Sequence, residues 1–337
     1  VKKFEKKIGH YLKSNYTLVC NSGTSALHLA FLSIGIKKDD VIIMPAVNFI
    51  ASFNLCKILQ AKVILADVDP ITGRMRPKDV EETIKKNKLK KIMAIISMHL
   101  GGVQENIINF YNLKKKYNCF LIEDACHAFG GRYKYGNKNL KIGCAKHADI
   151  STFSFHPIKS ITTAEGGALT TNNKRIYEKA SLLKSHGMKK NKLGKHWDYD
   201  IVENGYNFRL SDLNCALGIG QIDKINFFLK KRKIVAENYN KLFTNKPKNF
   251  LTPSINLSLS AWHLYIIMVN FKNVTQKDKF LTYMKKMGII IQFHYKPIYK
   301  FKIGKKLGKL PGSEKYYRTA ISLPIYVGLS KNQQVKI

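Results

Sequence analysis

Lys159 is the residue best placed to do chemistry, because it stands apart from the other basic residues of the chain. It follows an apolar, β-like run over 150–155 and precedes hydroxyl and glycine residues that favour a turn. Between residues 153 and 167 the only other charged side chain is Glu165. A lysine held between a buried strand and a turn loses water, which lowers its pKa and supplies a neutral amine as nucleophile or base. The pattern also fits a strand-end lysine that snorkels to solvent, so Lys159 needs partners to be interpreted.

An anion-binding helix start is predicted near the beginning of the chain. The apolar strand 16–20 leads into Asn21-Ser22-Gly23-Thr24-Ser25, and a helix with apolar residues at helical spacing follows. The free N–H groups of a first helical turn and the helix dipole both favour a phosphate or carboxylate. The alternative is an ordinary N-cap by serine or threonine, with no ligand.

A carboxylate and an imidazole follow another strand. Asp124 and His127 come directly after the apolar residues 119–122. A buried Asp124 would pair with a positive group, and His127 could orient it through a hydrogen bond. Asp124 equally fits a helix cap, so this pair is also ambiguous when taken alone.

The elements that carry these residues alternate between strand and helix. Short apolar strands are predicted at 41–44, 62–66, 91–97, 119–122, 150–155 and 166–171, with helices between most of them. This alternation predicts an α/β fold with a mainly parallel central sheet flanked by helices. In such sheets ligands bind outside the carboxyl ends of the strands, where Ser22–Ser25, Asp124 and Lys159 would meet.

The length of 337 residues indicates either two domains or one large domain with an appendage. We expect a large domain over 1–224 and a smaller C-terminal α+β domain over 225–337, joined by a bridging helix at about 211–243. The polar stretch 185–204 is too long for a simple connector, and we expect a mobile or ligand-binding loop there. In the small domain, His294-Tyr295-Lys296 lies in a turn that fits either a clamp for a phosphorylated ligand or a plain surface turn.

Composition narrows the class of protein. A hydrophobic content of 45% supports a packed core, and no apolar run is long enough to cross a bilayer. The net charge of +36 invites a nucleic-acid partner, but only seven of the 58 basic residues are Arg, so we expect none. The charge favours small acidic partners such as nucleotide phosphates. The six cysteines form no C-x-x-C pair, which indicates reduced thiols of a cytoplasmic protein and no metal site.

An isolated lysine, an anion-binding helix start, a carboxylate and an aromatic side chain at Phe49 have one common explanation. Pyridoxal 5′-phosphate needs a lysine for its Schiff base and N–H and hydroxyl donors for its phosphate. It also needs an acidic partner for its pyridine nitrogen and an aromatic or histidine side chain against its ring. The sequence therefore predicts an enzyme that uses this cofactor.

The sequence also resembles a known family, the DegT/DnrJ/StrS group of fold-type I aminotransferases, which act on nucleotide-linked keto-sugars. Five motifs carry the resemblance and occur in the family's order. They are Asn21-Ser22-Gly23-Thr24-Ser25-Ala26-Leu27, Glu123-Asp124-Ala125-Cys126-His127-Ala128, Phe153-Ser154-Phe155-His156-Pro157-Ile158-Lys159, Glu165-Gly166-Gly167 and Gly205-Tyr206-Asn207-Phe208-Arg209-Leu210. Relatives that are dehydratases or oxidative deaminases typically carry His at the lysine position, and Lys159 argues against those activities.

The resemblance implies a role for each motif residue. Lys159 would be the Schiff-base lysine and proton shuttle, and Asp124 would pair with the pyridine nitrogen. Phe49 would stack on one ring face, and His127 would lie near the ring hydroxyl. Gly23, Thr24 and Ser154 would hold the phosphate. Asn207 would reach the phosphate bound by the neighbouring subunit, because family sites are built across a homodimer interface.

Within this group the chain is similar to the UDP-4-amino-4,6-dideoxy-N-acetyl-β-L-altrosamine transaminases of pseudaminic acid biosynthesis, through residues 162–167, 185–188 and 294–299. This similarity implies amino transfer from glutamate to UDP-2-acetamido-2,6-dideoxy-β-L-arabino-hexos-4-ulose. The alternatives are another UDP- or dTDP-linked keto sugar, or a non-catalytic cofactor-binding regulator. The sugar side would be lined by Thr163, Glu165, His294, Tyr295 and Lys296.

The sequence departs from the family pattern at its two ends. It starts at Val1 and stops soon after Leu323-Pro324. We therefore expect either a fragment or a processed chain, without the family's final helix and without its opening segment, which contributes to the sugar pocket.

Overall fold

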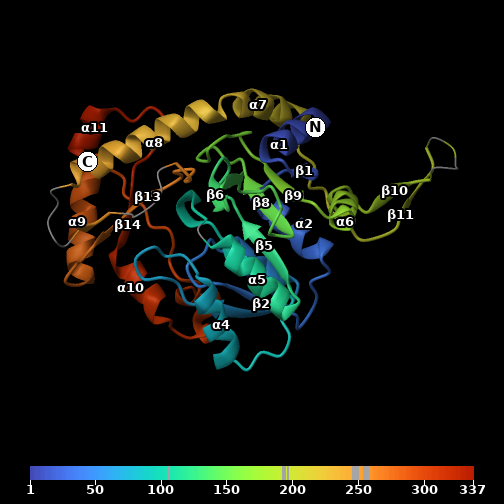
Figure 1. Ribbon diagram of the computed structural model, residues 1–337, viewed down its shortest axis with the longest axis horizontal. Coiled ribbons are helices and arrows are strands. Elements are labelled where there is room, and N and C mark those ends of the chain that lie inside the picture. Colours follow the sequence, from blue (N-terminus) through green and yellow to red (C-terminus); the bar gives the residue numbers. More distant parts are fainter. Residues whose placement is uncertain (105, 192–194, 196, 245–249, 253–257) are drawn as a thin grey trace.

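The computed structural model describes residues 1–104, 106–191, 195, 197–244, 250–252 and 258–337. Its centre is a seven-stranded sheet in the order β1-β9-β8-β5-β4-β2-β3 (Figure 1). The strands are β1 (Tyr16–Cys20), β2 (Val41–Pro45), β3 (Lys62–Ala66), β4 (Ala94–Met98), β5 (Phe120–Asp124), β8 (Ile150–Ser154) and β9 (Gly167–Thr171). All neighbours pair in parallel except β9, which is antiparallel to both β8 and β1.

The mainly parallel sheet confirms the predicted fold class. The antiparallel direction of β9 follows from the short connection that precedes it. The segment between β8 and β9 holds Lys159 but no helix. A parallel return needs a long crossover, whereas an antiparallel strand can follow a compact connection. The lysine therefore lies in a turn at the sheet edge where both flanking strands are fully buried apart from Ser154, which is partly exposed.

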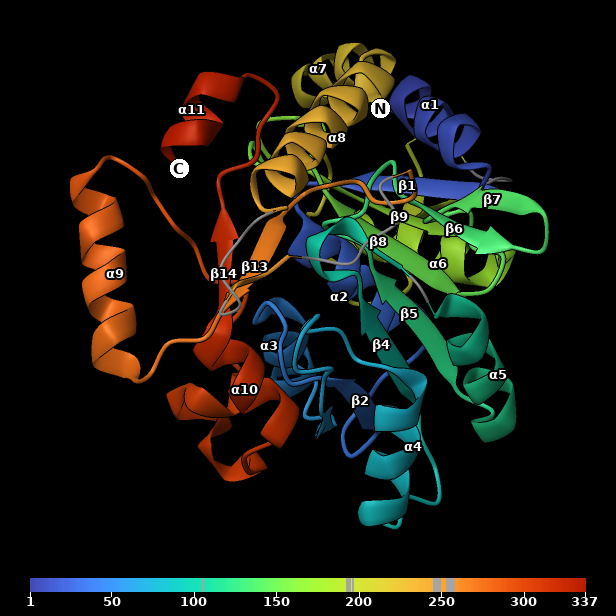
Figure 2. The ribbon, with the colours of Figure 1, turned by 60° about the vertical axis from the view of Figure 1, so that its left-hand side comes forward.

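Helices cover both faces of the sheet, as Figure 2 shows. One face packs against α2 (Gly23–Ser33), α3 (Ala51–Ile58) and α6 (Lys174–Lys184). The other face packs against α1 (Lys2–Leu12), α4 (Pro77–Lys86) and α5 (Ile107–Tyr117). Because both faces are covered, the strands carry near-continuous apolar runs.

The C-terminal part of the chain, called the small domain below, has a separate hydrophobic core around a three-stranded antiparallel sheet, and the boundary at residue 225 stays a prediction. Its strands are β12 (Phe250–Leu251), β13 (Tyr265–Val269) and β14 (Ala320–Leu323), in that order. Around the sheet lie α9 (Val274–Lys286), α10 (Pro311–Thr319) and α11 (Lys331–Lys336) (Figure 1). Trp262, Tyr239 and Tyr265 are buried in its core.

The predicted bridging helix is interrupted. It consists of α7 (Asp212–Asp223) and α8 (Ile225–Leu242), separated at Lys224. The backbone N–H of Lys224 bonds to the carbonyls of both Gln221 and Ile222, so the last turn of α7 is tightened and ends there. Together the two helices arch over the large domain toward the small one (Figure 1).

The length of the polar stretch 185–204 predicts a loop, but the structure has strands there. It contains the hairpin β10 (Met188–Lys190) and β11 (Tyr199–Ile201), which projects away from the body of the molecule (Figure 1). A second hairpin, β6 (Arg132–Tyr135) with β7 (Lys138–Lys141), lies beside the central sheet.

Among the described helices, none combines the length and the hydrophobicity that a membrane span requires.

One carboxylate fastens the small domain to the large one. Asp67, which follows β3, accepts hydrogen bonds from the backbone N–H groups of Gly312 and Ser313 and from the Ser313 hydroxyl, at 2.7–2.8 Å. It thereby satisfies the free donors at the start of α10, as an N-cap does. This contact ties the start of α10 to the segment that follows β3.

Candidate active site

The sheet brings the predicted site residues to one edge. Asp124 ends β5 and Ser154 ends β8, while Gly23 begins α2 just after β1. A Cβ atom added to Gly23 would lie 2.8 Å from the Ser154 Cβ and 3.3 Å from the Cys126 sulfur. Such distances are too short for any larger residue, so glycine lets the start of α2 pack directly against the ends of β5 and β8.

The start of α2 offers free donors at this edge. Ser22 is the N-cap, and its hydroxyl accepts the N–H of Ser25 at 3.0 Å. In the part of the chain that the structure describes, the N–H groups of Gly23 and Thr24 have no hydrogen-bond partner, as expected for a first turn. The Thr24 side chain is exposed beside them. This combination of free N–H groups, a hydroxyl and the helix dipole suits a phosphate.

Lys159 lies in the turn after β8 and is partly buried. Its backbone N–H bonds to the carbonyl of His156 at 2.9 Å, which fixes the turn. Among the described residues its amine makes no ion pair or hydrogen bond. Burial lowers the pKa of Lys159, while nearby Cys126 and Asp124 act in the opposite direction. The lowered pKa increases the share of neutral, nucleophilic amine.

Asp124 is a buried carboxylate with unused acceptors. The residue is 3% exposed, and its carboxylate accepts a long hydrogen bond of 3.3 Å from the N–H of Cys126 and forms no ion pair within the described residues. A buried carboxylate normally collects several donors or a cation. Asp124 therefore retains capacity for a positively charged N–H group.

His127 is held neutral and oriented. Its Nδ1 accepts the N–H of Gly101 at 3.4 Å, so the Nε2–H donates to the Tyr295 hydroxyl at 2.9 Å. Burial, followed by the neighbouring His263, Lys159 and His294, lowers the pKa of His127 far below its usual value. The imidazole therefore acts as a fixed, uncharged wall of the site.

Tyr295, from the small domain, packs beside Phe49 and His127. Its ring lies 5.7 Å from the ring of Phe49 and 5.8 Å from that of His127, measured between centroids. Burial, and then the Asp124 carboxylate, raises the pKa of the Tyr295 hydroxyl. Phe49 itself is half exposed, so one face of its ring is open.

The sequence profile of the DegT/DnrJ/EryC1/StrS aminotransferase family matches residues 1–337. The chain belongs to this family. It is 40% identical over 330 residues to a Campylobacter jejuni UDP-4-amino-4,6-dideoxy-N-acetyl-beta-L-altrosamine transaminase, covering 97% of this chain and 84% of that protein. The Helicobacter pylori enzyme of the same name is 32% identical over 337 residues, which is 97% of this chain and 85% of that enzyme.

Solved structures of the family share the fold. Helicobacter pylori PseC, an aminotransferase of pseudaminic acid biosynthesis, superposes with a TM-score of 0.90 at 32% identity, over 99% of this chain and 88% of PseC. The PLP-form of Spr1654 from Streptococcus pneumoniae gives a TM-score of 0.87 at 26% identity, over 98% of this chain and 87% of Spr1654. Members of the family are thus PLP-dependent aminotransferases.

The residues of this chain fit the family's cofactor. The buried Asp124 carboxylate has acceptors to spare, the Lys159 amine is unpaired among the described residues, and the start of α2 is packed tightly through Gly23. In pyridoxal 5′-phosphate, the pyridine nitrogen would pair with Asp124 and the aldehyde with Lys159. The phosphate would bind at the start of α2. The Ser154 side chain lies against Gly23, and its hydroxyl accepts the N–H of His156 at 3.4 Å.

Other predicted residues lie at the periphery. Asn207 is exposed, and the carbonyl of the next residue, Phe208, accepts the N–H of Asn21 at 3.0 Å. Glu165 is exposed, 3.8 Å from the His156 imidazole. Lys296 is exposed and lies over the Phe301 ring at 4.9 Å, away from the histidines. The family role of Asn207 toward a second subunit stays a prediction.

The Thr163 side chain forms its hydrogen bond within the turn that follows Lys159. It is fully buried, and its hydroxyl donates to the Glu165 carbonyl at 2.8 Å. The Thr163 carbonyl in turn accepts from the Asn214 amide. These contacts give Thr163 a role in shaping the turn after Lys159, and its predicted contact with sugar stays a prediction.

Sequence reasoning missed three residues at the site. Cys126 packs between Gly23 and Asp124, His263 lies with its ring centroid 4.1 Å from that of His127, and Arg232 is buried nearby on α8. His263 stands in the apolar run 261–269 with no turn signal, and Arg232 belongs to a basic cluster. Only the packing of the small domain against the large one reveals their position.

Proposed function

We propose that this chain is a PLP-dependent aminotransferase that moves an amino group from glutamate to C4 of UDP-2-acetamido-2,6-dideoxy-β-L-arabino-hexos-4-ulose, forming UDP-4-amino-4,6-dideoxy-N-acetyl-β-L-altrosamine. The observation that carries the proposal is the Lys159 amine, which has no ion pair or hydrogen bond within the described chain and lies beside the buried Asp124 carboxylate. The Campylobacter jejuni and Helicobacter pylori relatives support the choice of sugar.

The binding residues follow from the geometry. The first turn of α2 at Gly23 and Thr24, together with Ser154, would hold the phosphate, and Phe49 would cover one ring face. Asp124 would keep a proton on the pyridine nitrogen, because a buried carboxylate is stabilised by a cation. When bound, pyridoxal 5′-phosphate supplies an aldehyde that condenses with amines and a ring that accepts electron density.

Lys159 would move the proton. Its amine is unpaired among the described residues, and burial lowers its pKa, which favours the neutral amine that can take a proton from the donor's α-carbon. Neutral His127, fixed by Gly101 and Tyr295, does not compete for that proton. The Tyr295 hydroxyl remains protonated because its pKa is raised, and it closes the site on the side of the small domain.

Glutamate half-reaction spectroscopy tests the activity. Protein reconstituted with pyridoxal 5′-phosphate is mixed with L-glutamate, and the visible band of the bound cofactor should be lost as 2-oxoglutarate appears. A panel of UDP- and dTDP-linked 4-keto sugars should then restore the band, with the UDP-linked N-acetylated sugar reacting fastest. A protein that holds the cofactor but never responds to glutamate would be a binding protein instead.

A second candidate substrate is another nucleotide-linked keto sugar. The chain is 31% identical over 343 residues to a GDP-perosamine synthase from Escherichia coli O157:H7, over 100% of this chain and 88% of that protein. Including a GDP-linked 4-keto sugar in the panel separates this possibility, because the two substrates differ in base and in the substituent at C2.

We also propose a homodimer in the cytoplasm. Large apolar side chains are exposed on the projecting hairpin and on the bridging helices, among them Tyr199, Ile201, Leu213 and Phe227. Exposed apolar groups of this size support association with a second copy. All six cysteines are unpaired thiols, which supports a reducing compartment.

A further inference from the structure

Glu123 comes directly before Asp124 at the end of β5, and its carboxylate has no part in the proposed chemistry. Successive side chains of a strand point to opposite faces of the sheet, so Glu123 points away from Asp124. Glu123 is 2% exposed, and His99 and Ser151, which contact it, are also buried. Because an unpartnered buried carboxylate is costly, the partners of Glu123 show what holds it in place.

Two donors hold the Glu123 carboxylate. His99 Nε2 lies 2.9 Å from Oε1, and the Ser151 hydroxyl donates to Oε2 at 2.5 Å. Gln104 fixes the direction of the histidine bond. Its Oε1 accepts the N–H of Asn106 at 2.8 Å, so its amide nitrogen donates to His99 Nδ1 at 3.0 Å. With Nδ1 as acceptor, His99 Nε2 carries the hydrogen that it donates to Glu123. These bonds connect the residue after β4 to the strands β5 and β8.

His99 is also held through its backbone, by the next residue of β5. Its N–H donates to the carbonyl of Asp124 at 3.0 Å. Two consecutive residues, Glu123 by its side chain and Asp124 by its backbone, therefore hold the same histidine. The Asp124 carboxylate itself accepts a long bond of 3.3 Å from the N–H of Cys126, which restrains it weakly. Its direction therefore depends on the backbone that His99 and Glu123 fix.

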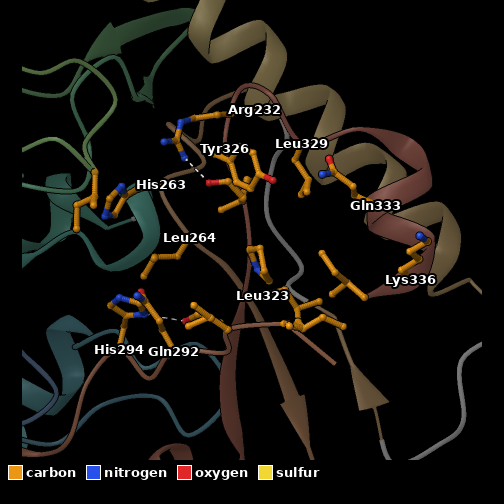
Figure 3. Close-up of a pocket in the computed structure, with 18 of the residues that line it drawn as sticks. Arg232, His263, Leu264, Gln292, His294, Leu323, Tyr326, Leu329, Gln333 and Lys336 are labelled. Atoms are coloured by element: carbon orange, nitrogen blue, oxygen red, sulfur yellow. Dashed lines mark hydrogen bonds between the residues drawn. The ribbon is translucent and has the colours of Figure 1, made fainter. Parts of the chain in front are cut away.

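The turn that follows His99 extends this support to His127. It is the 3₁₀ turn η1 (Leu100–Gly102), and its Gly101 N–H is the donor that His127 Nδ1 accepts at 3.4 Å. The Gly101 carbonyl accepts the N–H of His263 at 3.1 Å. His263 in turn borders a cavity of about 1010 Å³ that is lined mostly by the small domain (Figure 3). A change at His99 therefore reaches both the end of β5 and the imidazole of His127.

We propose that Glu123 and His99 are positioning residues for Asp124: their buried hydrogen bond sets the end of β5 so that the Asp124 carboxylate faces the pyridine nitrogen of the cofactor. The inference rests on the proposed function, because it assigns the support of the residue that pairs with this nitrogen. Neither Glu123 nor His99 takes part in the reaction itself. A pair that only stabilised the fold would lower stability when broken, but it would not change how strongly the site favours a ring nitrogen.

Binding of two ligands to the apoprotein tests the proposal without turnover. One is pyridoxal 5′-phosphate, and the other is its analogue with C–H in place of the ring nitrogen. Absorbance titration gives both dissociation constants, and their ratio measures the contact between Asp124 and the nitrogen. Wild type should prefer pyridoxal 5′-phosphate by roughly 10- to 100-fold, as expected for a charge-assisted hydrogen bond. Asp124→Asn should lose most of this preference.

Glu123→Leu should reduce the preference by about 10-fold and change the affinity for the analogue by less than about threefold. Leucine fills similar space but leaves the His99 N–H and the Ser151 hydroxyl without their acceptor. Glu123→Gln should keep the preference within about threefold of wild type, because its amide oxygen still accepts the His99 hydrogen. If Glu123→Leu does not fold, Ser151→Ala decides, with an expected loss of roughly three- to tenfold.

Thr171→Val is the matched control. Thr171 is buried in the same sheet, and its hydroxyl donates at 2.6 Å to the carbonyl of Asp149, which precedes β8 at the edge opposite Asp124. The variant should unfold at lower urea concentration but keep the wild-type preference. Unchanged preference in Glu123→Leu, or an equal loss in Thr171→Val, would overturn the proposal. If Asp124→Asn removes the preference and Glu123→Leu does not, the positioning fails and the proposed site stands. If both remove it but glutamate never reacts, the proposed function fails and the positioning stands.

Discussion

Lys159 and Asp124 take their chemistry from burial. The amine lies in a turn where two buried strands meet, and the carboxylate ends a third. Each lacks a full set of partners among the described residues, which would be costly in a protein that bound nothing there. The two orphan groups are therefore explained together by one ligand that carries an aldehyde and a protonated ring nitrogen.

Replacing Lys159 by alanine should abolish transamination and remove the visible band of covalently bound cofactor. The reason is that no other amine lies in the turn at this edge. Absorbance spectra after reconstitution, with Lys285→Ala on the exposed surface of α9 as control, provide the measurement. Normal turnover by the Lys159 variant would remove this residue from the mechanism.

Asp124→Asn should still bind the cofactor but react slowly. The amide matches the carboxylate in size and cannot hold the pyridine proton, so the glutamate half-reaction should slow by roughly 10²- to 10³-fold. Stopped-flow absorbance measures this rate. If the variant reacted within a factor of about three of wild type, Asp124 would be a helix-capping residue only.

The sequence predicts Lys159, Asp124 and Gly23 well because each follows a strand, and strand ends of a parallel sheet share one edge. It does not predict His263 or Arg232, because their contact with the site depends on how the second domain docks. Lys296 and Tyr295 show why sequence alone does not assign side-chain contacts. The two residues are neighbours in one turn, but their side chains contact different residues. Tyr295 bonds to His127, whereas Lys296 lies over Phe301.

Among the secondary-structure elements, α2 has a first turn whose position depends on the absence of a Cβ atom at Gly23. A Cβ on its first residue, Gly23, would meet Ser154 at the end of β8 and Cys126 just after β5. Helix position and phosphate binding are therefore coupled, because the N–H groups that would hold the phosphate move with the helix.

Gly23→Ala should weaken cofactor binding more than it weakens the fold. The added methyl group would lie 2.8 Å from the Ser154 Cβ, which forces α2 outward and costs about 1–3 kcal/mol of stability. Titration with pyridoxal 5′-phosphate and urea unfolding of the same variant measure the two effects.

Gly220→Ala on α7 is the matched control. Its Cβ would meet nothing within 4 Å, so the change should stabilise the helix by up to about 1 kcal/mol and leave cofactor affinity unchanged. Equal cofactor affinity in both variants would contradict the packing argument. The pair isolates the contact from the general effect of removing a glycine.

At the scale of the whole molecule, the domain interface is built from neutral histidines. His127, His263 and His294 meet where the small domain closes on the strand ends. Burial lowers the pKa of all three, that of His294 to about 4. Between pH 6.5 and about 4 the unfolded chain therefore binds more protons, so stability falls as the pH falls through this window.

His294→Asn should reduce this acid sensitivity. For His294 alone, the gap between 6.5 and about 4 corresponds to a loss of up to about 3 kcal/mol on acidification. Urea unfolding at pH 7 and pH 4.5 should show a smaller difference for the variant than for wild type, with asparagine retaining the bond to Ser322. An identical difference in both proteins would place the acid sensitivity elsewhere.

Asn207 gives the test of the proposed dimer. It is exposed, and the family resemblance gives it a role at the phosphate of a second subunit. If so, each site takes Lys159 from one copy and Asn207 from the other. Lys159→Ala and Asn207→Asp should each be inactive alone, the second because a carboxylate repels the phosphate.

Mixing the two variants should restore activity. After unfolding and refolding together, about half of the dimers would carry one copy of each, and each of those would contain one intact site, giving about a quarter of wild-type activity. If both residues serve a site within one chain, no intact site forms and the mixture stays inactive. Activity of the mixture, measured beside size-exclusion chromatography, therefore distinguishes a shared site from two separate ones.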